Sequence, residues 1–152
     1  MERKEAALEA FQEGYNCTQA VLVAFAADLD MPPDAATRLG EGFGGTTCNC
    51  GMPCGALLGA IMGLGLYAGR REAEDWEASG RVERLRLRLS QAFENRFGAI
   101  ECRTLLGADI TTETGFMQAR NEGRFLRCGE YVEGAAVLLD ALLQDDGALS
   151  EE

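Results

Sequence analysis

The sequence predicts an all-α protein, a single helical domain over residues 1–152 built as a bundle of five to six helices. Apolar residues recur every three or four positions in several segments, which is the period of an amphipathic helix. Glycine, proline and helix-capping residues separate these segments. With 152 residues, 47% of them hydrophobic, the chain is large enough to bury one core without disulfides.

The N-terminal part predicts two helices separated at a glycine. The first is expected over residues 3–13, and Gly14 is placed to end it. Asn16, with Gln19 three residues later, forms a variant of the capping box and predicts a second helix that stops near Asp28. One continuous helix bent at Gly14 is the alternative that the sequence leaves open.

A glycine-rich loop containing cysteines precedes the helix expected at the centre of the bundle. A short helix from Pro33 or Asp34 to Leu39 comes before this loop, and residues 40–51 then hold five glycines. Pro53 is expected to open the central helix, because proline is favoured in a first helical turn.

The central helix carries a glycine every four residues, at Gly55, Gly59 and Gly63. A glycine inside a helix costs about 0.8–1.0 kcal/mol relative to alanine, so three on one face need a reason. Close approach of another backbone is the explanation that we favour. Space for a cofactor or a thiol pair beside Cys54 is the alternative.

Four further segments complete the predicted fold. Residues 75–97 form a long amphipathic helix, residues 101–106 a short one, and residues 111–121 a weak helix or a loop. Residues 124–143 are the final helix, and residues 145–152 are expected to be a frayed acidic tail.

The charge balance excludes several classes of partner. The chain has 25 acidic and 14 basic residues, a net charge of −11, which argues against nucleic-acid binding and anionic membranes. The apolar stretch 54–68 is shorter than the about 20 residues of a spanning helix, so no membrane insertion is expected. The start of the chain lacks the apolar region of a signal peptide, and we expect a cytoplasmic, reducing location. A basic group on the long helix is expected to be a solvated face rather than a docking site for an acidic partner, and comprises Arg81, Arg84, Arg86 and Arg88.

Sulfur chemistry is the function that the composition indicates, because the chain has six cysteines and no histidine. Four of the cysteines stand at expected helix starts, namely Cys17, Cys54, Cys102 and Cys128. The free N–H groups and partial positive charge of a helix N-terminus favour the thiolate, which is the form that attacks, oxidises or binds metal. These four are far apart in the chain and can meet only through the fold.

Three functions fit this cysteine set. Four thiolates could ligate an iron–sulfur cluster for electron transfer, which we favour because crowded thiolates repel and a cation relieves the repulsion. A thiol–disulfide oxidoreductase could instead use Cys54 as the attacking thiol and Cys48 or Cys50 as the resolving one. A non-redox metal-binding or interaction module is the third. Cys48 and Cys50 are further metal-ligand candidates, and whether the protein is an enzyme stays open.

The cysteine pattern also resembles that of a known family. Cys54, Gly55, Ala56 and Gly59 match the motif Cys-Gly-Ala-x-x-Gly, with a single cysteine before it and two after it. The chain therefore resembles the C-GCAxxG-C-C family of redox-active proteins. The resemblance implies a small bacterial or archaeal helical protein with a redox or iron–sulfur role and a redox partner protein. Homo-oligomerisation stays open, and the loop cysteines depart from the family pattern.

Overall fold

The computed structural model describes residues 1–44 and 52–150, and within these residues the fold is all-helical, as predicted. The number of helices is wrong, because the described residues contain eight α-helices instead of five or six. The difference lies in short segments of five to nine residues, which the sequence located but which are marginal as helices until they pack against the rest of the fold.

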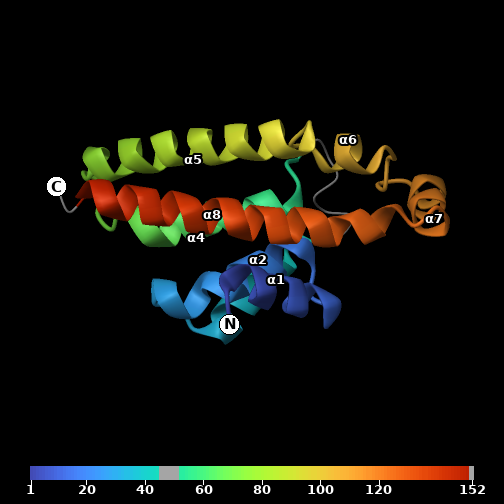
Figure 1. The fold of residues 1–152 in the computed structure, drawn as a ribbon, viewed down its shortest axis with the longest axis horizontal. Coiled ribbons are helices and arrows are strands. Elements are labelled where there is room, and N and C mark those ends of the chain that lie inside the picture. Colours follow the sequence, from blue (N-terminus) through green and yellow to red (C-terminus); the bar gives the residue numbers. More distant parts are fainter. Residues whose placement is uncertain (45–51, 151–152) are drawn as a thin grey trace.

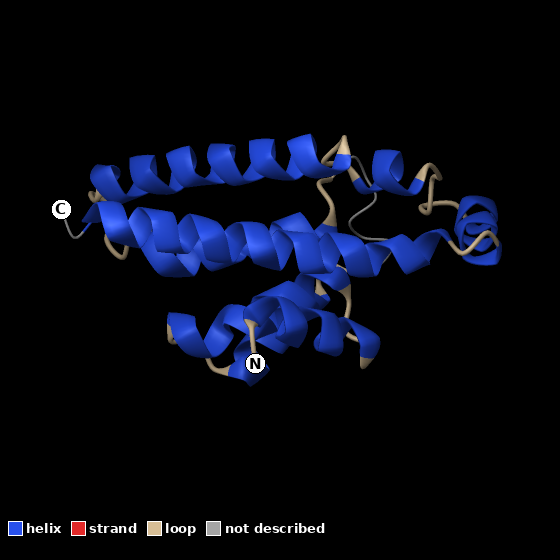
Figure 2. Ribbon diagram, viewed as in Figure 1, coloured by secondary structure: helices blue, strands red, loops and turns tan. Residues whose placement is uncertain are grey.

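The helices form a long layer, a crossing layer and a cap at one end (Figure 1). The long layer runs along the molecule and contains α4 (Gly55–Ala68), α5 (Trp76–Phe97) and α8 (Cys128–Ser150). The crossing layer packs beneath it and contains α1 (Arg3–Gln12), α2 (Cys17–Ala26) and α3 (Pro33–Glu41). The cap lies at the end where α8 begins and contains α6 (Cys102–Leu106) and α7 (Glu113–Asn121). Figure 2 shows the short loops between them, and two 3-10 turns, η1 (Ala27–Leu29) and η3 (Arg124–Arg127), continue or precede helices.

The break between α1 and α2 is a true break, so the alternative of one bent helix is wrong. Gly14 has φ 108°, which a helix does not allow. Asn16 then accepts a hydrogen bond from the Gln19 backbone N–H, and the Gln19 side chain accepts one from the Asn16 N–H. This reciprocal capping box fixes the first turn of α2, as the sequence predicted.

The glycine face of α4 is a site of close helix approach. A Cβ at Gly59 would lie 2.6 Å from the carbonyl oxygen of Thr18, and one at Gly55 would lie 2.9 Å from the Thr18 hydroxyl oxygen. Further along, a Cβ at Gly63 would lie 2.9 Å from a methyl group of Leu139 on α8. Two of the three glycines therefore allow α2 to pack closely on α4, and the third leaves room for a side chain of α8. These contacts support the close-approach explanation.

Two element boundaries differ from the prediction. Pro53 does not open α4, because it pairs with Glu101 in an isolated antiparallel bridge and the next residue, Cys54, donates its N–H to the carbonyl of Ile100. Residues 145–150 of the expected frayed tail are helical instead, because α8 continues to Ser150.

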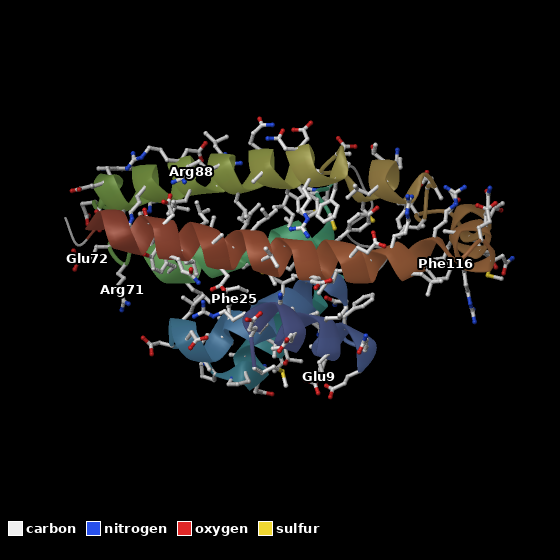
Figure 3. The ribbon with its side chains drawn as sticks, viewed as in Figure 1. Glu9, Phe25, Arg71, Glu72, Arg88 and Phe116 are labelled. Atoms are coloured by element: carbon white, nitrogen blue, oxygen red, sulfur yellow. The ribbon has the colours of Figure 1, made fainter. Side chains whose placement is uncertain are left out.

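Ion pairs between α5 and α8 explain the helical tail. Arg81 pairs with Asp146, and Arg88 pairs with Asp145 at 2.7 Å. Arg86 pairs with Glu83 one turn earlier on its own helix. The basic group of α5 is thus largely matched by local and cross-helix carboxylates, in line with the expected solvated face. Arg88, labelled in Figure 3, lies on α5 and reaches Asp145 of α8.

The core lies where α2, α4 and α8 meet, and charged side chains surround it. Phe25 of α2 is fully buried, and the Arg3 guanidinium lies 5.0 Å from its ring centre. Figure 3 shows Glu9, Arg71 and Glu72 pointing outward from the helices, where all three are exposed. Among the described helices, none combines the length and the apolar character needed to cross a membrane.

A matched pair of glycine substitutions in α4 tests the close approach. Gly59→Ala should destabilise the fold by about 1–3 kcal/mol, because the new methyl would press on the backbone of Thr18. Gly65→Ala is the control, because nothing lies within 4 Å of its Cβ position and alanine should stabilise that turn by up to about 1 kcal/mol. Urea unfolding of both variants measures the difference, and equal effects would contradict the packing argument.

Candidate functional site

Four cysteines far apart in the chain line one cavity of about 190 Å³. They are Cys17, Cys54, Cys102 and Cys128. Each comes from a different helix, so the cavity lies where the starts of α2, α4, α6 and α8 converge. Cys48 and Cys50 belong to residues 45–51, outside the described part of the chain.

Each of the four thiols is carried at the start of a helix. Cys17, Cys102 and Cys128 are the first residues of α2, α6 and α8, and Cys54 is the N-cap residue of α4. The helix starts expected from the sequence are therefore correct at all four positions. A helix start has free backbone N–H groups and, in the longer helices, a partial positive charge.

Cys54 shows two opposing effects on one thiol. It is 4% exposed, and burial raises its pKa to about 12. The backbone N–H groups of Ala56 and Leu57 donate hydrogen bonds to its sulfur and act in the opposite direction, favouring the thiolate. Desolvation outweighs these bonds, so at neutral pH the isolated Cys54 side chain carries its proton.

Cys17 and Cys128 form a hydrogen-bonded pair of sulfurs. The bond to Cys128 is the largest cause that raises the pKa of Cys17 well above its usual value, with burial second. The same bond lowers the pKa of Cys128, against the effect of burial.

The remaining cysteine belongs to the same electrostatic group. A negative charge on Cys102 raises the pKa of both Cys17 and Cys54. Four thiolates at these positions would repel one another, so the site disfavours full ionisation unless a positive group enters.

The walls between the sulfurs are mostly apolar and aromatic, which limits the water available to the thiols. They are formed by Phe11, Phe43, Leu105, Leu106, Ile110, Phe125 and Tyr131. Tyr131 also donates its hydroxyl to the Leu105 carbonyl at 3.3 Å. The sequence analysis did not identify these residues, because an aromatic at helical spacing is indistinguishable from an ordinary core residue.

Thr18 connects the start of α2 to two other parts of the cavity wall. The sequence analysis did not identify this residue either. It is fully buried beside Cys17, and its hydroxyl lies 2.9 Å from the Gly55 carbonyl and 3.1 Å from the Phe43 carbonyl. The neighbouring Gln19 donates to the Thr37 carbonyl at 2.8 Å. These bonds hold the start of α2 against the start of α4 and the end of α3.

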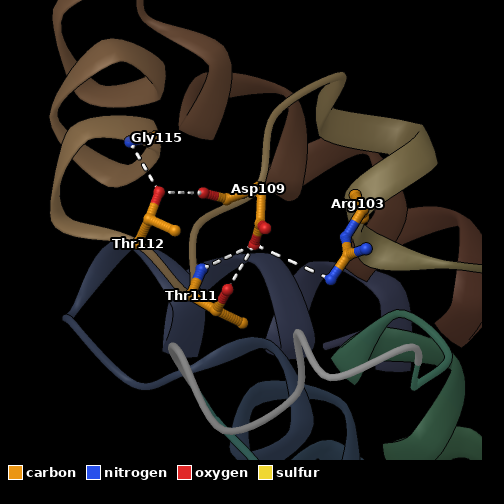
Figure 4. Close-up of polar contacts among 5 residues, drawn as sticks. All are labelled: Arg103, Asp109, Thr111, Thr112 and Gly115. Atoms are coloured by element: carbon orange, nitrogen blue, oxygen red, sulfur yellow. Dashed lines mark hydrogen bonds and ion pairs between the residues drawn. The ribbon is translucent and has the colours of Figure 1, made fainter.

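A polar turn supports the cavity on the α6–α7 side, and Figure 4 shows its contacts. Asp109 accepts hydrogen bonds from the backbone and side chain of Thr111, and these bonds lower the pKa of Asp109. Thr112 donates to the Asp109 carbonyl at 3.1 Å and caps α7 through Gly115 N–H. The turn holds Ile110 between these residues, in the cavity wall.

The end of α6 and the helix α7 both contact η3. Arg124 donates to the carbonyls of Leu106 and Gly107, at 2.8 and 3.0 Å. Phe116 of α7, labelled in Figure 3, packs on Phe125 with ring centres 5.3 Å apart. Phe125 is thereby fixed as a wall of the cavity next to Cys128.

A metal ion needs several side-chain donors placed close together. In residues 1–44 and 52–150, no group of three or more histidine, cysteine, aspartate or glutamate side chains is placed to hold one. The four sulfurs line one shared cavity. All four are cysteines, which is the usual donor set of iron–sulfur clusters.

Fold and site together define a small helical protein with a buried four-cysteine centre. The sequence profile of the family described as "Putative redox-active protein (C_GCAxxG_C_C)" matches residues 15–142, a range that contains all six cysteines. The chain belongs to this family, as the resemblance of its motif indicated. Comparisons with curated proteins and with solved structures found no match.

Substitution of Thr18 tests whether its hydroxyl holds the cavity walls together. Thr18→Val keeps the shape but leaves buried carbonyl groups without their donor, and should cost about 1–3 kcal/mol of unfolding free energy. Thr18→Ser keeps the donor and should lose less. Thermal or urea unfolding distinguishes the two variants, and a valine variant as stable as the serine variant would contradict the hydrogen-bond argument.

The stability of the protein should fall at alkaline pH because of Cys54. Its folded-state pKa of about 12 lies above the ordinary value of 9.0, so its contribution is complete below pH 9 and is lost as the pH rises toward 12. The difference of about three units corresponds to at most about 4 kcal/mol. The measurement is the unfolding free energy of the parent minus that of Cys54→Ser from pH 8 to 11. A difference independent of pH would contradict the assigned burial of this thiol.

Proposed function

We propose that this chain is a redox protein in which four thiolates hold an iron–sulfur cluster for electron transfer. The observation that carries the proposal is the convergence of four helix-start cysteines on one apolar cavity. The ligands would be Cys17, Cys54, Cys102 and Cys128. Membership of a family described as redox-active supports the general class of function.

The cost of ionising the buried thiols favours a cationic group in the cavity. Burial raises the pKa of Cys54, and a neighbouring sulfur together with burial raises that of Cys17. Thiolate charge is therefore costly there without a partner, and the iron of a cluster would provide one while displacing the thiol protons. A bound cluster would supply one-electron redox chemistry, which thiols alone do not.

The chain's own groups would tune such a centre. The N–H groups of Ala56 and Leu57 already point at the Cys54 sulfur, and hydrogen bonds to ligand sulfur are one determinant of cluster potential. The apolar walls would keep water away, whereas the half-buried Cys17 and Cys102 bring the centre near the surface. A redox partner protein in the cytoplasm is the expected electron donor or acceptor.

The geometry gives less support to the two other functions. An oxidoreductase that attacks through Cys54 would need its thiolate near neutral pH, but burial raises the pKa of this thiol to about 12. Its expected resolving partners, Cys48 and Cys50, lie outside the described residues. A module for a single metal ion lacks a group of three suitably placed donors in the described part of the chain.

Anaerobic purification followed by visible spectroscopy and by iron and sulfide analysis tests the proposal. The parent should be brown with iron and sulfide in similar amounts. Serine substitution of any one proposed ligand should lower the iron content severalfold. The ligand variants are Cys17→Ser, Cys54→Ser, Cys102→Ser and Cys128→Ser.

The double variant Cys48→Ser, Cys50→Ser is the matched control, because it removes two thiols from the same chain. It should keep the iron content of the parent. Loss of iron in this variant would show that the loop cysteines are ligands. A colourless parent without iron would contradict the proposed iron–sulfur cluster.

A further inference from the structure

We propose that residues 108–122, which we call the α7 segment, form a cap that opens as a unit and gives access to the four-cysteine cavity. The segment contains α7 and the polar turn before it, and Figure 1 shows α7 at one tip of the molecule. Opening would let a cofactor reach the buried thiols, and this role rests on the proposed function. The opening itself does not depend on which group the cavity binds.

Both ends of the α7 segment adjoin a glycine in the left-handed region of backbone conformation. Gly107 has φ 66° and ends α6, and Gly123 has φ 67° and separates α7 from η3. Glycine changes between backbone conformations at little steric cost. Hinges of moving segments are a few residues of this kind, in loops or at the ends of elements. The segment therefore lies between two positions at which the backbone can turn.

Little apolar surface holds the α7 segment against the rest of the molecule. Of residues 108–122, Ile110 and Ala119 are buried, and the others are half-buried or exposed. These two pack with Leu106 and Cys128 in a small apolar cluster that is distinct from the main core. Segments with few buried contacts open at a lower free energy than global unfolding. We therefore expect the segment to open while the main bundle stays folded.

The same small cluster makes the burial of one cavity thiol dependent on the α7 segment. Cys128 is 8% exposed, and two of its three buried neighbours in the cluster, Ile110 and Ala119, belong to the segment. Ile110 also lines the cavity, so an open segment would remove part of the wall. Cys54 instead packs in the main core. Opening should therefore expose Cys128 more than Cys54.

The Arg124 guanidinium holds the two ends of the α7 segment together. It donates hydrogen bonds to the carbonyls of Leu106 and Gly107, where the chain enters the segment. Its Nε lies 2.6 Å from a carboxylate oxygen of Glu122, where the chain leaves it. A Cβ at Gly107 would lie 2.5 Å from this guanidinium, so the glycine also makes room for the contact. Arg124 is therefore placed to keep the segment closed.

The alkylation rate of Cys128 measures the opening without iron. The full-length chain is treated with an iron chelator and a phosphine reductant, exposed to an alkylating reagent for increasing times and cleaved with trypsin. Cys128 lies alone on the peptide 128–152, and Cys17 alone on the peptide 5–38. In Arg124→Gln the Cys128 rate should rise about fivefold to twentyfold, because charge-assisted hydrogen bonds that close the segment are lost. The rate of the half-buried Cys17 should change less.

Arg120→Gln is the matched control, because it removes an exposed arginine from α7 itself and leaves both ends of the segment intact. This variant should keep the Cys128 rate of the parent. An unchanged Cys128 rate in Arg124→Gln, or an equal increase in both variants, would overturn the assignment of Arg124.

Hydrogen exchange of the same proteins tests whether the segment opens locally. In the parent, the amides of α7 should exchange faster than those of α4, and Arg124→Gln should accelerate α7 while leaving α4 unchanged. Exchange of α7 as slow as that of α4 in the parent would overturn the proposed opening. Equal acceleration of both helices in Arg124→Gln would overturn it as well, because Arg124 would then stabilise the whole fold.

The rate of iron uptake tests the part that rests on the proposed function. The reduced chain receives ferrous iron and sulfide under anaerobic conditions, and its visible absorbance is followed with time. Arg124→Gln should reach the final iron content of the parent, but sooner. An unchanged rate would overturn the role of the opening in cofactor entry. A chain that takes up no iron in either form would reject the proposed function instead, and the alkylation and exchange results would still decide the opening.

Discussion

The contact between the backbones of α2 and α4 is the constraint on which the rest of the structure depends. Gly55 and Gly59 lack the side chains that would keep the two helices apart, and the Thr18 hydroxyl bonds across the gap to the Gly55 carbonyl. Cys17 precedes Thr18 and Cys54 precedes Gly55, so the contact that packs the core also brings two thiols to one place. The motif Cys-Gly-Ala-x-x-Gly thus combines a ligand candidate with the packing surface that positions it.

The cavity combines buried thiols with apolar walls, and both features are costly to the fold. Buried thiols resist ionisation, and an apolar hollow forfeits packing contacts. Buried hydrogen bonds, from Thr18 to Gly55 and from Tyr131 to Leu105, stabilise the walls of the cavity against these costs.

The sequence was sufficient where the signal is local. The cap formed by Asn16 and Gln19 located the start of α2, and the four-residue spacing of glycines indicated a close helix approach. It failed where the deciding partner is distant in the chain. The helical tail depends on pairs such as Arg81 with Asp146, and nothing near Asp146 shows this.

The site was predictable to a similar degree. The four cysteines could be selected as one group because each stands at a helix start. Their arrangement could not be predicted, because the contact between Cys17 and Cys128 results from the packing of α2 on α8. Thr18 could not be recognised either, since a threonine within a helix gives no sign of the carbonyl groups that it meets in the folded protein.

The spread of the four cysteines along the chain also determines when the site can exist. During synthesis Cys17 is made early, but its partner Cys128 belongs to the last helix, and the cavity needs the starts of α2, α4, α6 and α8 at once. Contacts between such distant residues form late, after the intervening segments have been ordered. A nascent or clipped chain therefore has no four-cysteine cavity. The site is available only on molecules that have completed folding.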